Sequence, residues 1–201
     1  MSDIKSTKER QKEILDAAQL LFASKGYDAT SVSDIMKAVG IAKGTLYYHF
    51  SSKEEILDAL IARIVEHMVE RANKILDEHN LSAPQKMIRI ILAINVTSYG
   101  EEEIIKTLHH PQNALLHQKS YRLSVQRICP ILTEVVKEGI EEGVFITDFP
   151  EAAVHMALTY SMIAFEDIQA IELTLIQGFI YNLERLLGAK SGTLDEFYQC
   201  F

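Results

Sequence analysis

Side chains that form hydrogen bonds gather in one short stretch near the N-terminus of this 201-residue chain. From Lys43 to Phe50 the sequence reads KGTLYYHF, in which Lys, Thr, His and two Tyr all carry donors or acceptors and none is acidic. Such side chains suit contacts with phosphate groups and with base edges in a DNA groove. Gly44 has no side chain, so a DNA strand could approach the backbone closely there.

Two short predicted helices flank a tight turn and would position this stretch. The first helix follows Ser31 and ends at Gly40, and the second runs from about Lys43 to His49. Apolar residues at helical spacing give each helix a buried face. Gly40 favours the positive φ that the turn requires. Residues 31–50 therefore predict a helix-turn-helix.

Helical patterns also cover the rest of the chain, and strand patterns are almost absent. One amphipathic helix ends at Lys25, and Ser52 with Glu55 forms a capping box that begins a long helix reaching Leu76. We expect a kink at Pro130. Further helices are expected near 84–99, 101–108, 112–142, 151–168 and 171–188. The predicted fold is all-α, with an N-terminal three-helix helix-turn-helix domain and a larger C-terminal helical domain.

Charge and composition narrow the class of protein. The net charge is −8, but residues 1–53 carry a net charge of +2 and residues 54–201 one of −10, so the N-terminal part would turn toward a polyanion. No apolar run is long enough to span a membrane, and the charged N-terminus lacks a signal core, so we expect a cytoplasmic protein. Cys129 and Cys200 match no metal or redox spacing, and we expect no cofactor and no metal.

These motifs resemble the TetR family of bacterial transcriptional regulators. The resemblance covers about residues 8–68, and its motifs are Gly26-Tyr27, Thr30-Ser31-Val32, Asp34-Ile35, Ala38-Val39-Gly40, Lys43 through Phe50, and Ser52 through Glu55. Ala42 departs from the pattern, because the family more often has a serine there as the N-cap of the recognition helix. The resemblance implies a DNA-binding domain at 8–68 and a ligand-binding and dimerisation domain at 69–201.

The resemblance also implies roles for the residues of the motif. Residues at the start of its first helix would face a phosphate. In its second helix, Thr45 and Tyr48 would reach base edges, while Tyr47 and His49 would anchor phosphates. Lys53 would contact the DNA backbone from the next helix. The expected DNA-binding residues are Thr30, Ser31, Ser33, Lys43, Gly44, Thr45, Tyr47, Tyr48, His49 and Lys53.

In the C-terminal domain the resemblance implies a homodimer and a pocket for a small-molecule effector. The last two long predicted helices are apolar over more than one face, which is typical of helices buried both within a subunit and against a second copy. The expected interface residues are Ala153, Met156, Tyr160, Leu175, Phe179 and Leu183. The expected pocket residues are Tyr99, His109, His110, His117, Tyr121, Met156, Tyr160 and Phe165. Since no carboxylate completes a site with these histidines, we expect no metal there.

Together these features predict a ligand-responsive regulator that binds a palindromic double-stranded DNA operator as a dimer. The main expectation is a repressor that releases DNA when a small amphipathic molecule binds. The alternatives are a transcriptional activator and a helical protein-interaction module. We expect no enzyme, because the sequence has no nucleophile elbow, glycine-rich phosphate loop or His/Glu metal pair at helical spacing.

Overall fold

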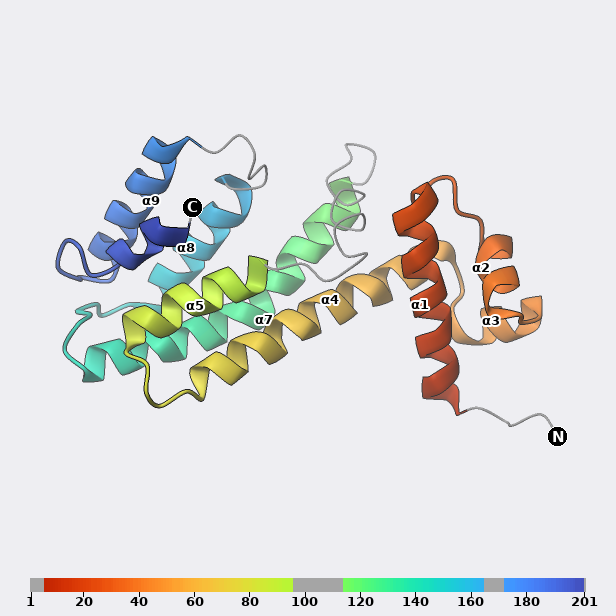
Figure 1. Cartoon of the computed structure of the whole chain (residues 1–201), viewed down its shortest axis with the longest axis horizontal. Coiled ribbons are helices and arrows are strands. Elements are labelled where there is room, and N and C mark those ends of the chain that lie inside the picture. The colour runs from red at the N-terminus through yellow and green to blue at the C-terminus, as the bar shows by residue number, and fades with distance from the viewer. Residues whose placement is uncertain (1–5, 96–113, 165–171, 201) are drawn as a thin grey trace. The chain divides into compact units, whose positions relative to one another are not determined.

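The computed structural model describes residues 6–95, 114–164 and 172–200, and within them every regular element is a helix (Figure 1). The helices are α1 (Thr7–Lys25), α2 (Val32–Val39), α3 (Lys43–His49), α4 (Lys53–Leu76), α5 (Ala83–Asn95), α7 (Ala114–Glu141), α8 (Pro150–Ala164), α9 (Leu173–Leu186) and the 3-10 helix η3 (Asp195–Cys200). The all-α prediction is confirmed. The helix expected at 101–108 lies outside the described residues.

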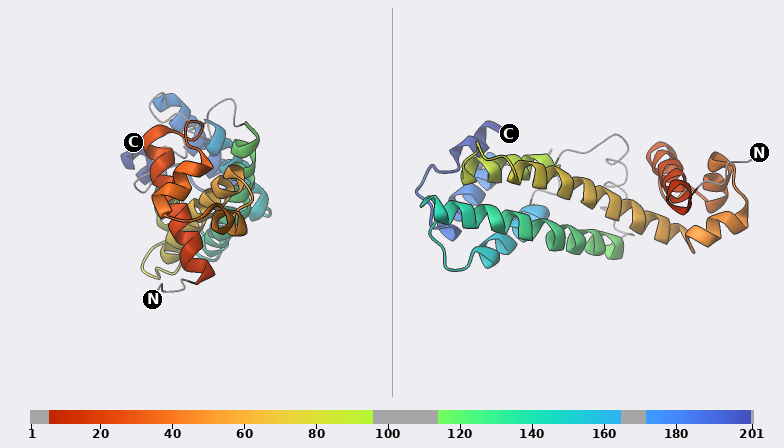
Figure 2. Two further views of the ribbon diagram at one scale, coloured as in Figure 1. Left: turned by 90° about the vertical axis from the view of Figure 1, so that its right-hand side faces the viewer. Right: turned by 90° about the horizontal axis from the view of Figure 1, so that it is seen from below.

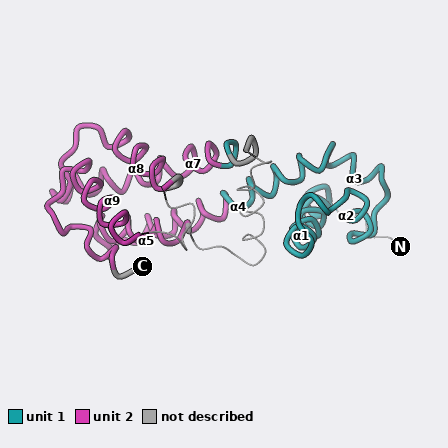
Figure 3. Tube along the Cα trace, turned by 90° about the horizontal axis from the view of Figure 1, so that it is seen from above, with its two compact units in different colours: residues 1–65, 97–120 teal, residues 66–96, 121–201 magenta. Residues whose placement is uncertain are grey.

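The chain divides into two compact units (Figure 3). Unit 1 comprises Met1–Val65 and Thr97–Ser120, and unit 2 comprises Glu66–Val96 and Tyr121–Phe201. The helices α4 and α7 each continue from one unit into the other. Among the described helices, none has the length and apolar character needed to cross a membrane.

Unit 1 is built around the apolar faces of its first four helices. Its fully buried side chains include Ile14 and Phe22 of α1, Ile35 of α2 and Leu46 of α3. The α2–α3 turn has the conformation that the sequence predicts, because Gly40 adopts φ 71° and ψ 37°, in the left-handed region. The start of α4 completes this core with Ile56, Leu57 and Leu60, all fully buried. The helix-turn-helix is therefore held by its apolar side.

Side-chain caps fix where α2 and α4 begin. At α2, the Ser31 hydroxyl accepts a hydrogen bond from the Asp34 amide at 3.2 Å, and the Asp34 carboxylate accepts one from the Ser31 amide at 2.8 Å. At α4, Ser52 Oγ accepts from the Glu55 amide at 3.1 Å. The Glu55 carboxylate, however, accepts from the amide of Ser51 and not from that of Ser52. The expected capping box at α4 is thus correct in one half and displaced by one residue in the other.

Unit 2 packs α5, α7, α8, α9 and the last residues of α4 around a second core. The C-terminal part of α4 and the part of α7 after Ser120 lie side by side (Figures 1 and 2). An ion pair joins them, between Arg127 of α7 and Glu66 of α4 at 2.6 Å. The buried Lys86 of α5 pairs with Glu138 of α7 at 2.7 Å. The helix α7 continues through Pro130, which offers no backbone N–H to the preceding turn. A kink at that residue stays a prediction.

The segment after α9 is anchored to unit 2, which the sequence does not indicate. Leu194 and Phe197 are buried, and the backbone amide of Leu194 donates to the Glu184 carboxylate at 2.9 Å. Glu184 is itself only 5% exposed. A buried carboxylate is costly without donors, so this hydrogen bond fixes the C-terminal segment against α9.

Candidate nucleic-acid interface

The short helix α3 presents a polar surface that no other described part of the chain covers. Leu46 is fully buried and Phe50 is 5% exposed, whereas Tyr47 and Tyr48 are 45% and 77% exposed. Lys43 and Gly44 are exposed as well, and Thr45 and His49 are half-buried. Two large aromatic side chains on a surface without acidic residues are therefore free to contact a partner.

Contacts between neighbouring side chains orient this surface. The Lys43 ammonium lies 5.7 Å from the centroid of the Tyr47 ring, and the rings of Tyr48 and His49 meet edge to face with centroids 5.0 Å apart. The Nδ1 atom of His49 is buried, and the described residues give it no hydrogen-bond partner. Ala42 leaves α3 without a side-chain cap. The lost cap costs about 1 kcal/mol.

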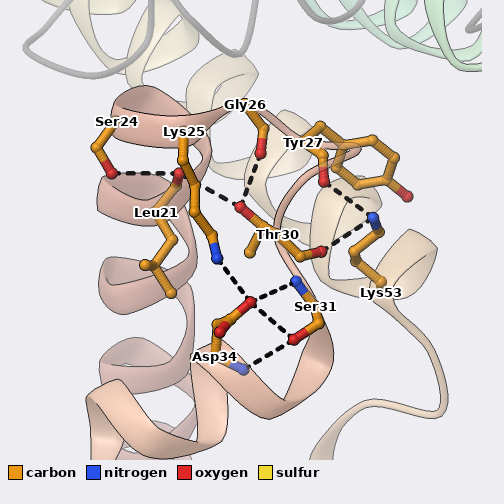
Figure 4. Close-up of polar contacts among 9 residues, drawn as sticks. All are labelled: Leu21, Ser24, Lys25, Gly26, Tyr27, Thr30, Ser31, Asp34 and Lys53. Atoms are coloured by element: carbon orange, nitrogen blue, oxygen red, sulfur yellow. Dashed lines mark hydrogen bonds and ion pairs between the residues drawn. The ribbon is translucent and has the colours of Figure 1, made fainter.

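The start of α2 forms the second part of the candidate surface. Ser31 and Ser33 are exposed. The Asp34 carboxylate accepts hydrogen bonds from Lys25 Nζ and from Ser31 Oγ, both at 2.7 Å (Figure 4). These hydrogen bonds hold the pKa of the Asp34 carboxyl well below its usual range. Because Lys25 is paired with this carboxylate, the start of α2 does not carry an uncompensated negative charge that would repel a phosphate.

Two residues that the sequence analysis places on phosphates have partners inside unit 1. Thr30 is 1% exposed, and its hydroxyl donates to the carbonyl oxygens of Gly26 at 2.7 Å and Leu21 at 3.3 Å. Lys53 Nζ donates to the carbonyl oxygens of Tyr27 at 2.9 Å and Thr30 at 3.1 Å (Figure 4). Sequence spacing places both residues beside the motif, but it does not show these contacts.

The aromatic ring beside Lys53 belongs to Tyr27 of the Gly26-Tyr27 motif. Lys53 Nζ lies 4.1 Å from the centroid of this ring, and the ring packs edge to face on Phe22 at 5.1 Å. Burial, with Glu54 nearby, raises the pKa of the Tyr27 phenol to about 12. Tyr27 is therefore neutral at physiological pH and serves as a platform for the ammonium.

The structure describes the expected effector-pocket residues only in part. Tyr99, His109, His110 and Phe165 lie outside the described residues, as does the side chain of His117 in α7. Tyr121 of α7 has a buried hydroxyl to which the described residues offer no hydrogen-bond partner. Within unit 2, an open groove of about 360 Å³ lies between α7 and the start of α8 and is lined by Glu134, Phe149 and Glu151, among others. None of the expected pocket residues lines this groove, and the described residues contain no cluster fit to hold a metal ion.

The expected dimer residues divide into a buried group and an exposed group. Ala153, Phe179 and Leu183 are 4%, 7% and 4% exposed, and they form part of the core of unit 2. Met156 and Tyr160 of α8 and Leu175 of α9 are 58%, 48% and 36% exposed. Leu173 and Tyr181, which the sequence analysis missed, are 61% and 49% exposed on α9. The two helices therefore keep a large apolar surface accessible in the single chain.

Family models match both the N-terminal and the C-terminal part of the chain. Residues 14–60 match the family described as "Bacterial regulatory proteins, tetR family", and residues 95–171 match "Tetracyclin repressor-like, C-terminal domain". Over 150 residues the chain is 29% identical to the HTH-type transcriptional repressor KstR2 of Mycobacterium tuberculosis, an alignment that covers 69% of this chain and 70% of that protein.

Solved structures show the same fold over nearly the whole chain. A putative TetR-family transcriptional regulator from Syntrophomonas wolfei is 21% identical with a TM-score of 0.64, covering 92% of this chain and 97% of that one. The regulator RolR in complex with resorcinol is 15% identical with a TM-score of 0.63, covering 95% and 93%. The similarity thus extends over the helix-turn-helix and the C-terminal helices together.

Proposed function

Because the chain belongs to the TetR family of transcriptional regulators, we propose that it binds a palindromic double-stranded DNA operator as a homodimer. The observation that carries this proposal is the exposed surface of α3, where Tyr48 is 77% exposed beside Tyr47 and Lys43. Solvent-exposed aromatic residues on a short, acid-free helix suit insertion into a major groove, where both base edges and phosphates are within reach.

In this proposal α3 is the recognition helix. Thr45 and Tyr48 read base edges, and Tyr47 and His49 contact phosphates on either side. Gly44 lets the DNA backbone come close to the helix. Lys43 supplies a positive charge at the start of α3, and the exposed serines of α2 contact a phosphate through the N-terminus of their helix. The proposed contacts are Ser31, Ser33, Lys43, Gly44, Thr45, Tyr47, Tyr48 and His49.

The homodimer is proposed from the accessible apolar surface of α8 and α9. One short recognition helix contacts few base pairs, so two copies on half-sites one DNA turn apart give the required specificity. Met156, Tyr160 and Leu175 would become buried against the second copy, and Phe179 would support Tyr160, whose ring stacks on it at 5.9 Å. We accordingly assign residues 8–68 to DNA binding and residues 69–201 to ligand binding and dimerisation.

The regulation is proposed to be release of the operator by a small amphipathic ligand. The related KstR2 is named a repressor, and RolR has been solved with resorcinol bound. A ligand held by the C-terminal domain would act only through its different affinity for the DNA-bound and free conformations. A coupling of about 3 kcal/mol would lower operator affinity by about 150-fold. We propose no catalytic activity, and we place the protein with its DNA in the bacterial cytoplasm.

The test is selection of DNA from a random duplex pool of about 30 base pairs, enough for two half-sites one turn apart. We expect a palindromic consensus, binding by a dimer in sedimentation at micromolar concentration, and an affinity that falls linearly on a log–log plot against salt. Enrichment of no sequence together with a flat salt response would contradict DNA binding and favour the protein-interaction alternative. A monomer in sedimentation would contradict the proposed interface.

A further inference from the structure

The side chain of Lys53 connects the start of α4 to the loop between α1 and α2. Building on the proposed function, we propose that Lys53 is a positioning residue, which fastens these two segments and so holds α2 and α3 in the orientation that binds DNA. In this role Lys53 does not contact a phosphate itself. All of the contacts that carry the proposal lie within unit 1.

The protein surrounds the Lys53 ammonium with two carbonyl oxygens and one aromatic ring. Two of its three N–H donors are used by the carbonyl oxygens of Tyr27 and Thr30, at 2.9 and 3.1 Å. The face of the Tyr27 ring lies 4.1 Å from Nζ, at a distance where a cation is attracted by the ring. Charge-assisted hydrogen bonds of this kind are about twice as strong as neutral ones.

The loop that receives Lys53 is fixed from its other side by Thr30. The Thr30 hydroxyl donates to the carbonyl oxygens of Gly26 and Leu21 (Figure 4). The next residue, Ser31, is the N-cap of α2. The loop between α1 and α2 is thus held by α1 through the Thr30 side chain and by α4 through the Thr30 carbonyl. A shift of the first turn of α4 would pull on the residue that precedes α2.

A phosphate contact that drew the Lys53 ammonium out of this site would break these hydrogen bonds. The carbonyl oxygens of Tyr27 and Thr30 would lose a charged donor, and the ammonium would leave the Tyr27 ring. Within the described residues, the one contact recorded for the Lys43 ammonium is with the exposed Tyr47 ring, whose centroid lies 5.7 Å away. The two lysines beside the motif are therefore assigned different tasks, with Lys43 at the DNA and Lys53 within the protein.

Three variants that remove one lysine charge each separate these tasks: Lys53→Met, Lys43→Met and Lys74→Met. Lys74 is an exposed residue in the last turn of the same helix as Lys53, and it serves as the matched control. The measurement is the affinity for the selected operator and for a nonspecific duplex, across a series of salt concentrations. Circular dichroism and thermal unfolding confirm that each variant is folded at the temperature used.

We expect Lys53→Met to weaken operator binding by about 2-fold to 30-fold, the range for substitutions along a coupling path, with an unchanged salt slope. Lys43→Met should make the slope shallower by about 1.8, which corresponds to one phosphate contact from each of the two subunits. Lys74→Met should change neither. A shallower slope for Lys53→Met would overturn the proposal in favour of a phosphate contact. Unchanged operator affinity would overturn it in favour of a purely structural tie.

The variant Thr30→Val tests the same loop without removing any charge. Thr30→Val keeps every lysine but loses the hydroxyl that holds the loop to α1, so operator affinity should fall with the salt slope intact. In the double variant of Lys53→Met and Thr30→Val, operator affinity should fall by less than the product of the two single fold-losses, because both substitutions act on one loop. A fold-loss equal to that product would contradict the shared role. If Lys53→Met does not fold, Thr30→Val with an operator affinity equal to that of the wild type overturns the proposal by itself. If the wild type binds no duplex at low salt, the proposed function fails instead.

Discussion

Gly44 offers a test in which stability and DNA binding should change in opposite directions. It is the second residue of α3, and a Cβ atom added there would meet nothing within 4 Å. Gly44→Ala should therefore keep the fold and raise the free energy of unfolding by about 0.5 to 1 kcal/mol, since alanine is the better helix former. For a chain of this length that corresponds to a rise in Tm of about 1 to 4 °C.

Operator binding should weaken in the same variant. If a DNA strand packs against the Gly44 Cα, an added methyl group costs about 1 to 3 kcal/mol at each half-site. For the dimer on two half-sites this is at least about 2 kcal/mol, or about a 30-fold loss of affinity. The assay is fluorescence anisotropy with the selected operator at fixed salt, beside thermal unfolding of the same samples. Asn73→Ala, at an exposed position of α4, is the control that should gain stability without losing affinity. A stabilised Gly44→Ala that binds as tightly as the wild type would refute the close approach of DNA.

Four further substitutions test other parts of the structure. Tyr48→Ala should leave the free energy of unfolding within about 0.5 kcal/mol of the wild-type value, because the side chain is 77% exposed. The same substitution should weaken operator binding by about tenfold. Operator affinity equal to that of the wild type would remove Tyr48 from the interface. Gly188→Ala should destabilise the chain by about 2 to 4 kcal/mol in denaturant unfolding, because Gly188 has φ 63° and a Cβ there would overlap the Ile146 carbonyl. Gly143→Ala is the control, since Gly143 has φ 73° and open space around it, and it should lower the free energy of unfolding by only about 1 to 2 kcal/mol. Similar losses of stability for Gly188→Ala and Gly143→Ala would show that the overlap with the Ile146 carbonyl is relieved. The lowered pKa of Asp34 means that its carboxylate stabilises the fold above about pH 4 and that this contribution is lost as the pH falls through the lowered pKa. The free energy of unfolding of Asp34→Asn should therefore depend less on pH than that of the wild type between about pH 5 and 2. Parallel plots of unfolding free energy against pH for the two proteins would contradict this contribution.

The sequence predicts best where structure depends on neighbours in the chain. The α2–α3 turn, the start of α2 after Ser31 and the bounds of α3 follow from residues a few positions apart, and the structure agrees with each. The capping box at α4 is displaced because Ser51 and Ser52 stand side by side, and both can approach Glu55. Local spacing cannot decide between two such neighbouring donors.

The contacts of the site could not be predicted in the same way. The two carbonyl partners of Lys53 lie 26 and 23 residues away in the sequence, and a backbone carbonyl carries no residue-type signal. Thr30 is buried although threonine is usually exposed, because the carbonyls at the end of α1 accept its hydroxyl. The exposed Leu173 and Tyr181 could have been found, because they stand eight residues apart on α9, a helical spacing that places them on one face.

The hydrogen bond between Glu184 and the Leu194 amide has a practical consequence for work with this protein. Truncation of residues 191–201 would remove that donor and uncover side chains that Leu194 and Phe197 now shield. Shortened versions made for crystallisation would then be prone to aggregate, for a reason unrelated to DNA or ligand.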